Sequence, residues 1–301
     1  MKLLITGGNG MVGKHLQEIL PDALYVGSKD GDLRDWLETE NLFETYKPDR
    51  VIHLAAKVGG IQDNINKPAE YFDDNILINT HVMNMCMRYK VKRFTGILST
   101  CIYPDFGNLP MYPMLEKHML LGPPAPTNFE YAYAKRCLAL QIEAYNTQYG
   151  TKYNYLTPCN LYSEYDNFNN ENKMHFITAL LKKIKTSDGE LNLLGTGKPL
   201  RQFMYAGDLA RVIKKVIDKD ITDSFNVAPP YNKSINDMAI NTLTYLKKDL
   251  KIKYSNPKLD GQRRKDVSNE KMLNHIPGFK FTSFEEGIKK VYDNFSKRYD
   301  K

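Results

Sequence analysis

The chain has 301 residues, of which 42% are hydrophobic, enough to bury a sizeable core in one large domain or two unequal ones. Its apolar runs are short and interrupted by charges, so we expect neither a membrane helix, which needs about 20 apolar residues, nor a secretion signal. The net charge of +7 comes from scattered lysines. That pattern disfavours a nucleic-acid surface, which needs a basic stripe with aromatics, but it suits anionic small molecules.

The four cysteines occur without a CxxC pair. We therefore expect free thiols in the reducing cytoplasm, with neither a disulfide framework nor a metal site. They are Cys86, Cys101, Cys137 and Cys159.

The chain opens with "KLLIT", a short apolar run typical of a buried strand, and "KHLQEIL" follows at helical spacing. Between them, Gly7, Gly10 and Gly13 form a GxxGxxG loop. Glycines let backbone amides approach a pyrophosphate, and the helix N-terminus adds donors and a favourable dipole. Strand, loop and helix together predict a dinucleotide site, to which Met11 and Val12 also contribute.

The end of the next predicted strand, "ALYVG", bears on the choice of cofactor. Ser28 and Lys29 follow it, and Asp30 and Asp32 come soon after, just before Leu33. A hydroxyl and a cation favour the 2′-phosphate of NADP, whereas an acidic residue can accept a hydrogen bond from the ribose 2′-hydroxyl of NAD. NADP is the favoured prediction, and NAD stays open.

Further buried strands are expected at "RVIHLAA", "RFTGILS", "KYNYLTPCN" and "DSFNVAP", with helices between them. This alternation predicts an α/β fold with a Rossmann-like doubly wound parallel sheet, in which Gly7, Ala55, Ser99 and Asn160 face one crevice. We expect residues 1–160 plus about 206–230 to form an NADP-binding domain, with Asp208 capping its last helix. Residues 161–205 plus 231–301 would form a smaller α/β substrate domain.

A helix is predicted from Tyr131 to about Tyr149. Positions four apart share a helix face, so Tyr131 stands beside Lys135, while Tyr133 points elsewhere. A neighbouring ammonium lowers the pKa of a phenol, and such a tyrosine can donate a proton to a carbonyl oxygen that receives a hydride. Ser99 could hydrogen-bond the same oxygen.

With Ser99, Tyr131 and Lys135 as a triad, the chain resembles the extended short-chain dehydrogenases/reductases. Within that family it is most similar to the GDP-L-fucose synthase branch, the GDP-4-keto-6-deoxy-mannose epimerase-reductases. The similarity runs from the glycine loop to "RRKDV" near Asp266. The segments that carry it include "GMVG", "AAKVGGI", "STCIYP", "PTNFEYAYAK", "NLY", "DNF" and "RQF".

The resemblance implies an NADP(H)-dependent reductase of the C4 ketone of a GDP-4-keto-6-deoxy sugar. It also implies that Cys101 and His175 act as the acid/base pair that inverts C3 and C5, and that two helices per subunit, around residues 75–89 and 131–149, form a homodimer. The cofactor contacts that it implies, beyond the glycine loop, are Ser28, Lys29, Asp32, Leu33, Ala55, Lys135, Asn160, Leu161 and His175. The implied substrate contacts are Asn160, Lys183, Arg201 and Lys265.

Four departures from the family pattern cluster on the predicted substrate and cofactor walls. They are Leu98, Ser163 and Leu194, and the segment "NNENKM", which is one residue longer than the common pattern. Because of them a seven-carbon sugar stays open beside the hexose. A dedicated 4-keto reductase that acts after a separate epimerase, an NAD-retaining sugar-nucleotide 4-epimerase and a cofactor-sensing regulator are the remaining alternatives.

Overall fold

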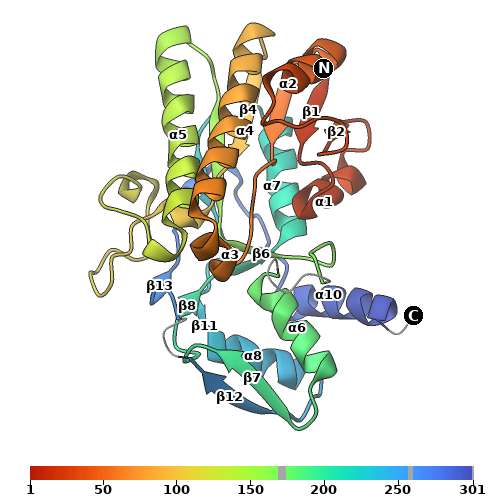
Figure 1. The fold of residues 1–301 in the computed structure, drawn as a ribbon, viewed down its shortest axis with the longest axis vertical. Coiled ribbons are helices and arrows are strands. Elements are labelled where there is room, and N and C mark those ends of the chain that lie inside the picture. The colour runs from red at the N-terminus through yellow and green to blue at the C-terminus, as the bar shows by residue number, and fades with distance from the viewer. Residues whose placement is uncertain (169–173, 257–259, 300–301) are drawn as a thin grey trace.

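The central element of the fold is a six-stranded parallel sheet, seen in the computed structural model, which describes residues 1–168, 174–256 and 260–299 (Figure 1). Every strand predicted for this sheet is present, because each is a short apolar run that the sheet buries. In spatial order the strands are β10 (Phe225–Val227), β5 (Asn154–Pro158), β4 (Arg93–Ile97), β3 (Arg50–His53), β1 (Leu3–Thr6) and β2 (Leu24–Val26).

The strand order reverses beside β1. The chain adds β2 on one side of β1 and then crosses to add β3 on the other, so later strands continue in the opposite direction. In open α/β sheets, ligands bind at such a switch point, beyond the carboxyl ends of the strands. Gly7 follows β1 and Ala55 lies just after β3, so both lie at this point, as predicted.

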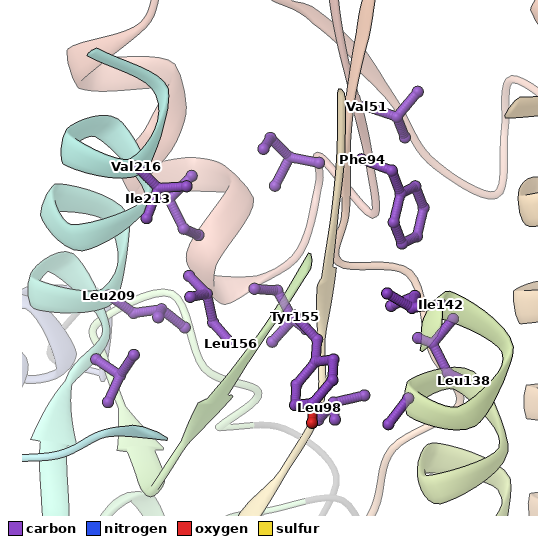
Figure 2. Close-up of a cluster of buried hydrophobic side chains, with 14 of the residues drawn as sticks. Val51, Phe94, Leu98, Leu138, Ile142, Tyr155, Leu156, Leu209, Ile213 and Val216 are labelled. Carbon is purple, nitrogen blue, oxygen red and sulfur yellow. The ribbon is translucent and has the colours of Figure 1, made fainter. Parts of the chain in front are cut away.

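Helices cover both faces of the sheet (Figure 1). Figure 2 shows Leu209, Ile213 and Val216 of one helix on one side, and Leu138 and Ile142 of another on the opposite side. All five side chains are buried, and each contributes roughly 1.5–3 kcal/mol relative to exposure. The first face carries α1 (Met11–Ile19) and α7 (Ala206–Asp218), and the second carries α2 (Trp36–Tyr46), α4 (Pro68–Arg88) and α5 (Phe129–Tyr149).

The rest of the chain lies beyond the carboxyl ends of the sheet strands, in the lower half of Figure 1. Its strands pair in three small sheets: β6 (Asn160–Tyr162) with β9 (Phe203–Tyr205), β7 (Glu190–Leu194) with β12 (Lys251–Ser255), and β8 (Leu200–Arg201) between β11 (Lys233–Ser234) and β13 (Arg264–Lys265). Its helices are α6 (Phe176–Thr186), α8 (Ile235–Tyr245) and α10 (Phe284–Tyr299). Helix α9 (Glu270–His275) lies instead beside the large sheet, where His275 stacks on Phe225 of β10. Segments from both sides of β10 therefore build this region.

Short helices complete the path between strands. These are α3 (Ile61–Asn66) and the 3-10 helices η1 (Thr100–Ile102), η2 (Glu116–His118) and η3 (Pro126–Asn128). Within the three described ranges, no helix combines the length and apolar character that crossing a bilayer requires.

The predicted cap of α7 is wrong. The helix begins at Ala206 with Tyr205 as its N-cap, and Asp208 lies within the first turn. The Asp208 carboxylate is buried and accepts hydrogen bonds from the backbone amide and the hydroxyl of Thr282, both at 2.7 Å. Asp208 therefore ties the segment that leads into α10 to the sheet region, a tertiary contact that no local pattern reveals.

Candidate active site

The glycine loop is shaped for a phosphate group. Gly7 has a φ of +70°, and a Cβ on it would stand 2.7 Å from the amide nitrogen of Ala55. A Cβ on Gly13 would stand 2.3 Å from the carbonyl oxygen of Gly8. Gly10 then precedes α1, whose first residues are Met11 and Val12, and offers no side chain to cap the helix amides. These amides can bind a pyrophosphate, aided by the helix dipole.

The residues after β2 are those predicted to decide between the 2′-phosphate of NADP and the 2′-hydroxyl of NAD. Ser28 and Lys29 are exposed, whereas Leu33 is buried. The carboxylate of Asp32 accepts from Arg34 at 2.6 Å, and this hydrogen bond is the main reason that the pKa of Asp32 is lowered. Because Arg34 already occupies Asp32, that carboxylate is engaged, and the exposed Ser28 and Lys29 are the side chains here that suit a 2′-phosphate. Sequence reasoning missed Arg34. The available signal was its position two residues after Asp32, with which it pairs.

Two cations fasten α5 to the segment that follows β4. Lys135 is almost fully buried and donates to the carbonyl of Ile97 at 2.9 Å. Arg136 donates to the carbonyl of Ile102 at 2.6 Å. Between these points, the Ser99 side chain caps η1 by accepting from the amide of Cys101 at 3.3 Å. The loop that presents Ser99 and Cys101 is thereby fixed against α5.

Tyr131 lies one helical turn before Lys135, as predicted, and its ring packs edge-on against Tyr71 with centroids 6.4 Å apart. The expectation of an acidified phenol is not met. Desolvation raises the pKa of Tyr131, with smaller contributions from Cys101 and Tyr71. Burial also lowers the pKa of Lys135, to about 8, and its ammonium group is directed at Ile97. A neutral phenol is nevertheless the form that donates a proton.

Cys101 has a cationic partner from a distant part of the chain. The Nζ of Lys265 lies 3.3 Å from its sulfur. Burial by itself would raise the pKa of Cys101, but Lys265, together with hydrogen bonds from Ser99 and Asn128, outweighs it and lowers that pKa. Asn128 is a further residue that sequence reasoning missed, although it lies in the "PTN" motif.

His175 has an anionic partner. It is the N-cap residue of α6, and its Nδ1 lies 3.1 Å from both carboxylate oxygens of Asp166. Thr178 donates to the same carboxylate. Burial lowers the pKa of His175, but Asp166 outweighs burial and raises it. Sequence reasoning included Asp166 in the "DNF" motif without giving it a role, because its contact with His175 depends on how the chain folds back.

The other predicted substrate and cofactor contacts have structural partners. Arg201 donates to the carbonyls of Leu200 and Asp260, at 2.9 and 3.4 Å. The Asn160 side chain donates to the carbonyl of Gln202 at 2.9 Å. The Lys183 ammonium donates to the carbonyl of Asn192 at 2.8 Å. Leu161 follows Asn160 in β6. Their ligand contacts stay predictions.

The departures from the family pattern have different settings. Leu98 is buried in the core, and Ser163 is fully buried with its Oγ 2.8 Å from Nε2 of His15. Leu194 ends β7 and is 60% exposed. Most of the longer segment, residues 169–173, lies outside the described residues. Among the departures that the structure describes, Leu194 is the one whose side chain points outward. Across the described ranges, no cluster of His, Cys, Asp and Glu is arranged to hold a metal ion.

Comparison with known proteins agrees with this geometry. Residues 3–228 match the model of the NAD dependent epimerase/dehydratase family. The chain belongs to this family. The GDP-L-fucose synthase of Dictyostelium discoideum is 35% identical, over 99% of this chain and 96% of its own length.

Solved structures extend the comparison. The crystal structure of a GDP-L-fucose synthetase from Naegleria fowleri bound to NADP is 33% identical, with a TM-score of 0.88 over 99% of this chain and 93% of its own. A GDP-6-OMe-4-keto-L-xylo-heptose reductase from Campylobacter jejuni has the same TM-score, 0.88, over 99% of this chain and 98% of its own. At 22% identity, the latter shares the fold alone.

Proposed function

We propose that the protein uses NADPH to reduce the C4 ketone of a GDP-4-keto-6-deoxy-hexose and also inverts C3 and C5 of that sugar. The observation that carries this proposal is the contrast between Cys101, which contacts a cation, and His175, which contacts an anion. The cation favours the thiolate of Cys101, which can take a proton, and the anion favours the imidazolium of His175, which can give one. Ser99, which follows β4, and Tyr131 and Lys135 of α5 add the groups that a ketone reduction needs.

The reduction needs a proton at the ketone oxygen. NADPH, when bound, supplies the hydride that C4 receives. The phenol of Tyr131 donates its proton to the oxygen, and the Ser99 hydroxyl hydrogen-bonds the same atom. Lys135 supports this geometry by holding α5 to the end of β4.

The inversion uses the acidity of protons next to the ketone. The Cys101 thiolate removes a proton from the ring carbon, and the ketone oxygen accommodates the resulting charge as an enolate. The His175 imidazolium then delivers a proton to the opposite face of that carbon. Exchange with solvent returns the thiol and the imidazole to their starting forms. Two such rounds invert two carbons.

The binding of both nucleotides is part of the proposal. The glycine loop, Ala55, Asn160 and Leu161 would hold the NADP(H) dinucleotide, with Ser28 and Lys29 at its 2′-phosphate. Arg201 suits the GDP diphosphate, because a guanidinium offers fixed, paired donors.

The proposal also covers the assembly of the enzyme and its location in the cell. We propose a homodimer that pairs α4 and α5 of each subunit, and a cytoplasmic location, which the four free cysteines support. The division into an NADP-binding domain and a substrate domain is likewise our proposal.

The deciding experiment follows GDP-4-keto-6-deoxy-mannose by NMR in deuterated water, with and without NADPH. Deuterium at C3 and C5 without NADPH, followed by NADPH oxidation when it is added, is the expected result. NADPH oxidation with no ring deuteration would instead indicate a dedicated reductase. A 4-epimerase would consume no net NADPH on this 4-ketone; it would copurify with tightly held NAD and invert C4 of a GDP-sugar that carries a C4 hydroxyl. If neither reaction occurs, the hexose is the wrong substrate and the corresponding heptose is the next to test.

Tyr131→Phe is the matched variant for this assay. It lacks the donated proton, so reduction should fall by about 10²–10⁴-fold while NADPH still binds. Normal reduction by this variant would contradict the triad assignment.

A further inference from the structure

The sulfur of Cys101 differs from the other three thiols in its surroundings. It contacts the ammonium of Lys265 at 3.3 Å and receives side-chain hydrogen bonds from Ser99 and Asn128. Cys86 and Cys159 are buried among apolar groups, and desolvation raises their pKa values. Desolvation also raises the pKa of Cys137, which lies on the exposed side of α5. Of the four, Cys101 is the thiol with donors around it.

The ammonium is held in place by strand pairing rather than by chance surface contact. Lys265 lies in β13, opposite Arg201 of the neighbouring β8. Immediately after it, the carbonyl of Asp266 accepts from the amide of Met114 at 2.9 Å, so the strand is anchored on its other side. The Asp266 carboxylate is bound by Arg264 at 2.6 Å. The nearest acidic group along the chain is thus occupied, and Lys265 is directed at the sulfur.

We propose that Lys265 is a positioning residue that holds Cys101 as a thiolate in the resting enzyme, before any sugar is bound. This inference rests on the proposed function, since it explains how Cys101 can remove a proton at neutral pH. A thiolate paired with an ammonium is the reactive form, whereas an ordinary cysteine is mostly protonated there. The family resemblance implies a substrate contact for Lys265, which stays a prediction; the contact present in the structure is with the sulfur of Cys101.

The other groups that face Cys101 favour its thiolate or do not oppose it. Arg201, from β8, interacts electrostatically with the sulfur and adds positive charge. Tyr131, from α5, remains a neutral phenol and brings no competing anion. Asn128, from η3, donates a hydrogen bond to the sulfur. The sulfur therefore has donors from three segments, which carry Lys265, Ser99 and Asn128, and Lys265 is the charged group in contact with it.

The test measures the thiol without substrate or cofactor. Purified protein reacts with iodoacetamide, a neutral reagent that Lys265 does not attract, over a range of pH, and peptide mass spectrometry reports the modification rate of each cysteine. Cys137 serves as the internal reference. Lys265→Met should shift the Cys101 profile upward by about 1–3 pH units and Lys265→Arg should restore most of it. At neutral pH the expected slowing is about 3–10-fold, because a more basic thiolate is also more nucleophilic.

A matched control and a second readout keep the test decisive. Lys214→Met removes an exposed lysine of α7 that pairs with Asp218, and should leave the Cys101 profile unchanged. The ultraviolet absorbance of the thiolate, taken as the difference between each protein and its Cys101→Ser form, needs no reagent to enter the site. Equal Cys101 profiles in wild type and Lys265→Met by both methods would overturn the proposal. Because no sugar is present, that outcome is distinct from a failure of the NMR assay.

Discussion

Cys101 and His175 have opposite electrostatic surroundings that arise in different ways. Cys101 contacts a lysine 164 residues away in sequence, whereas His175 contacts a carboxylate only nine residues away. The cation lowers the pKa of the thiol, and the anion raises the pKa of the imidazole. Each partner therefore favours the charged form of the group that it contacts. The contrast teaches that the partners of a thiol or an imidazole, and not only its residue type, decide which protonation state is favoured.

Removing either proton-transfer group should have the largest effect. We expect Cys101→Ser and His175→Asn each to slow deuterium incorporation at the ring carbons by about 10²–10⁴-fold, because each lacks one half of the acid/base pair. Reduction of a sugar already inverted at C3 and C5 should suffer far less. If only one variant loses deuteration, the two residues are not a pair and the contrast between them has no catalytic meaning.

Neutralising the anion beside His175 should have an intermediate effect. In Asp166→Asn the pKa of His175 loses its upward shift, so less imidazolium is present at neutral pH. We expect epimerisation to slow by about tenfold, with the alkaline limb of its pH profile moved to lower pH. Asp188→Asn, an exposed carboxylate just beyond α6, provides the control and should match wild type. An unmoved alkaline limb would show that Asp166 merely supports the fold.

The smallest effect concerns stability. The pKa of Asp166 is lowered, so its contribution is present above its unfolded pKa and disappears as pH falls through the folded value. The pKa of His175 is raised, so its contribution is present below its unfolded pKa and disappears as pH rises through the folded value. The pair should therefore stabilise most between about pH 4 and about pH 6.5.

Urea unfolding measures this contribution. Within that window, wild type should exceed Asp166→Asn by about 1 kcal/mol in free energy of unfolding, since the imidazole is partly exposed to solvent. The difference should shrink on either side. A difference that stays constant with pH would point to lost hydrogen bonds alone, without an ion pair.

The sheet and its ligand loop were predictable because their signals are local. Each sheet strand is an apolar run, the glycines stand between strand and helix, and the spacing of Tyr131 and Lys135 follows from helix geometry. Contacts that depend on tertiary folding were not predictable. The sequence gives no sign that Lys265 lies at the sulfur of Cys101, or that burial would raise the pKa of Tyr131. The prediction that Asp208 caps a helix was wrong for the same reason, because its partner, Thr282, lies in a distant segment.

The distance along the chain between Cys101 and Lys265 has a consequence for protein synthesis. A growing chain contains all six strands of the large sheet once β10 has been made, and with them the glycine loop and Tyr131. Lys265 is added later. On our proposal, the Cys101 thiol lacks its ammonium partner until β13 pairs with β8, and until then it behaves as an ordinary cysteine. The reactive thiolate would then form only after the C-terminal part of the chain has folded onto the large sheet.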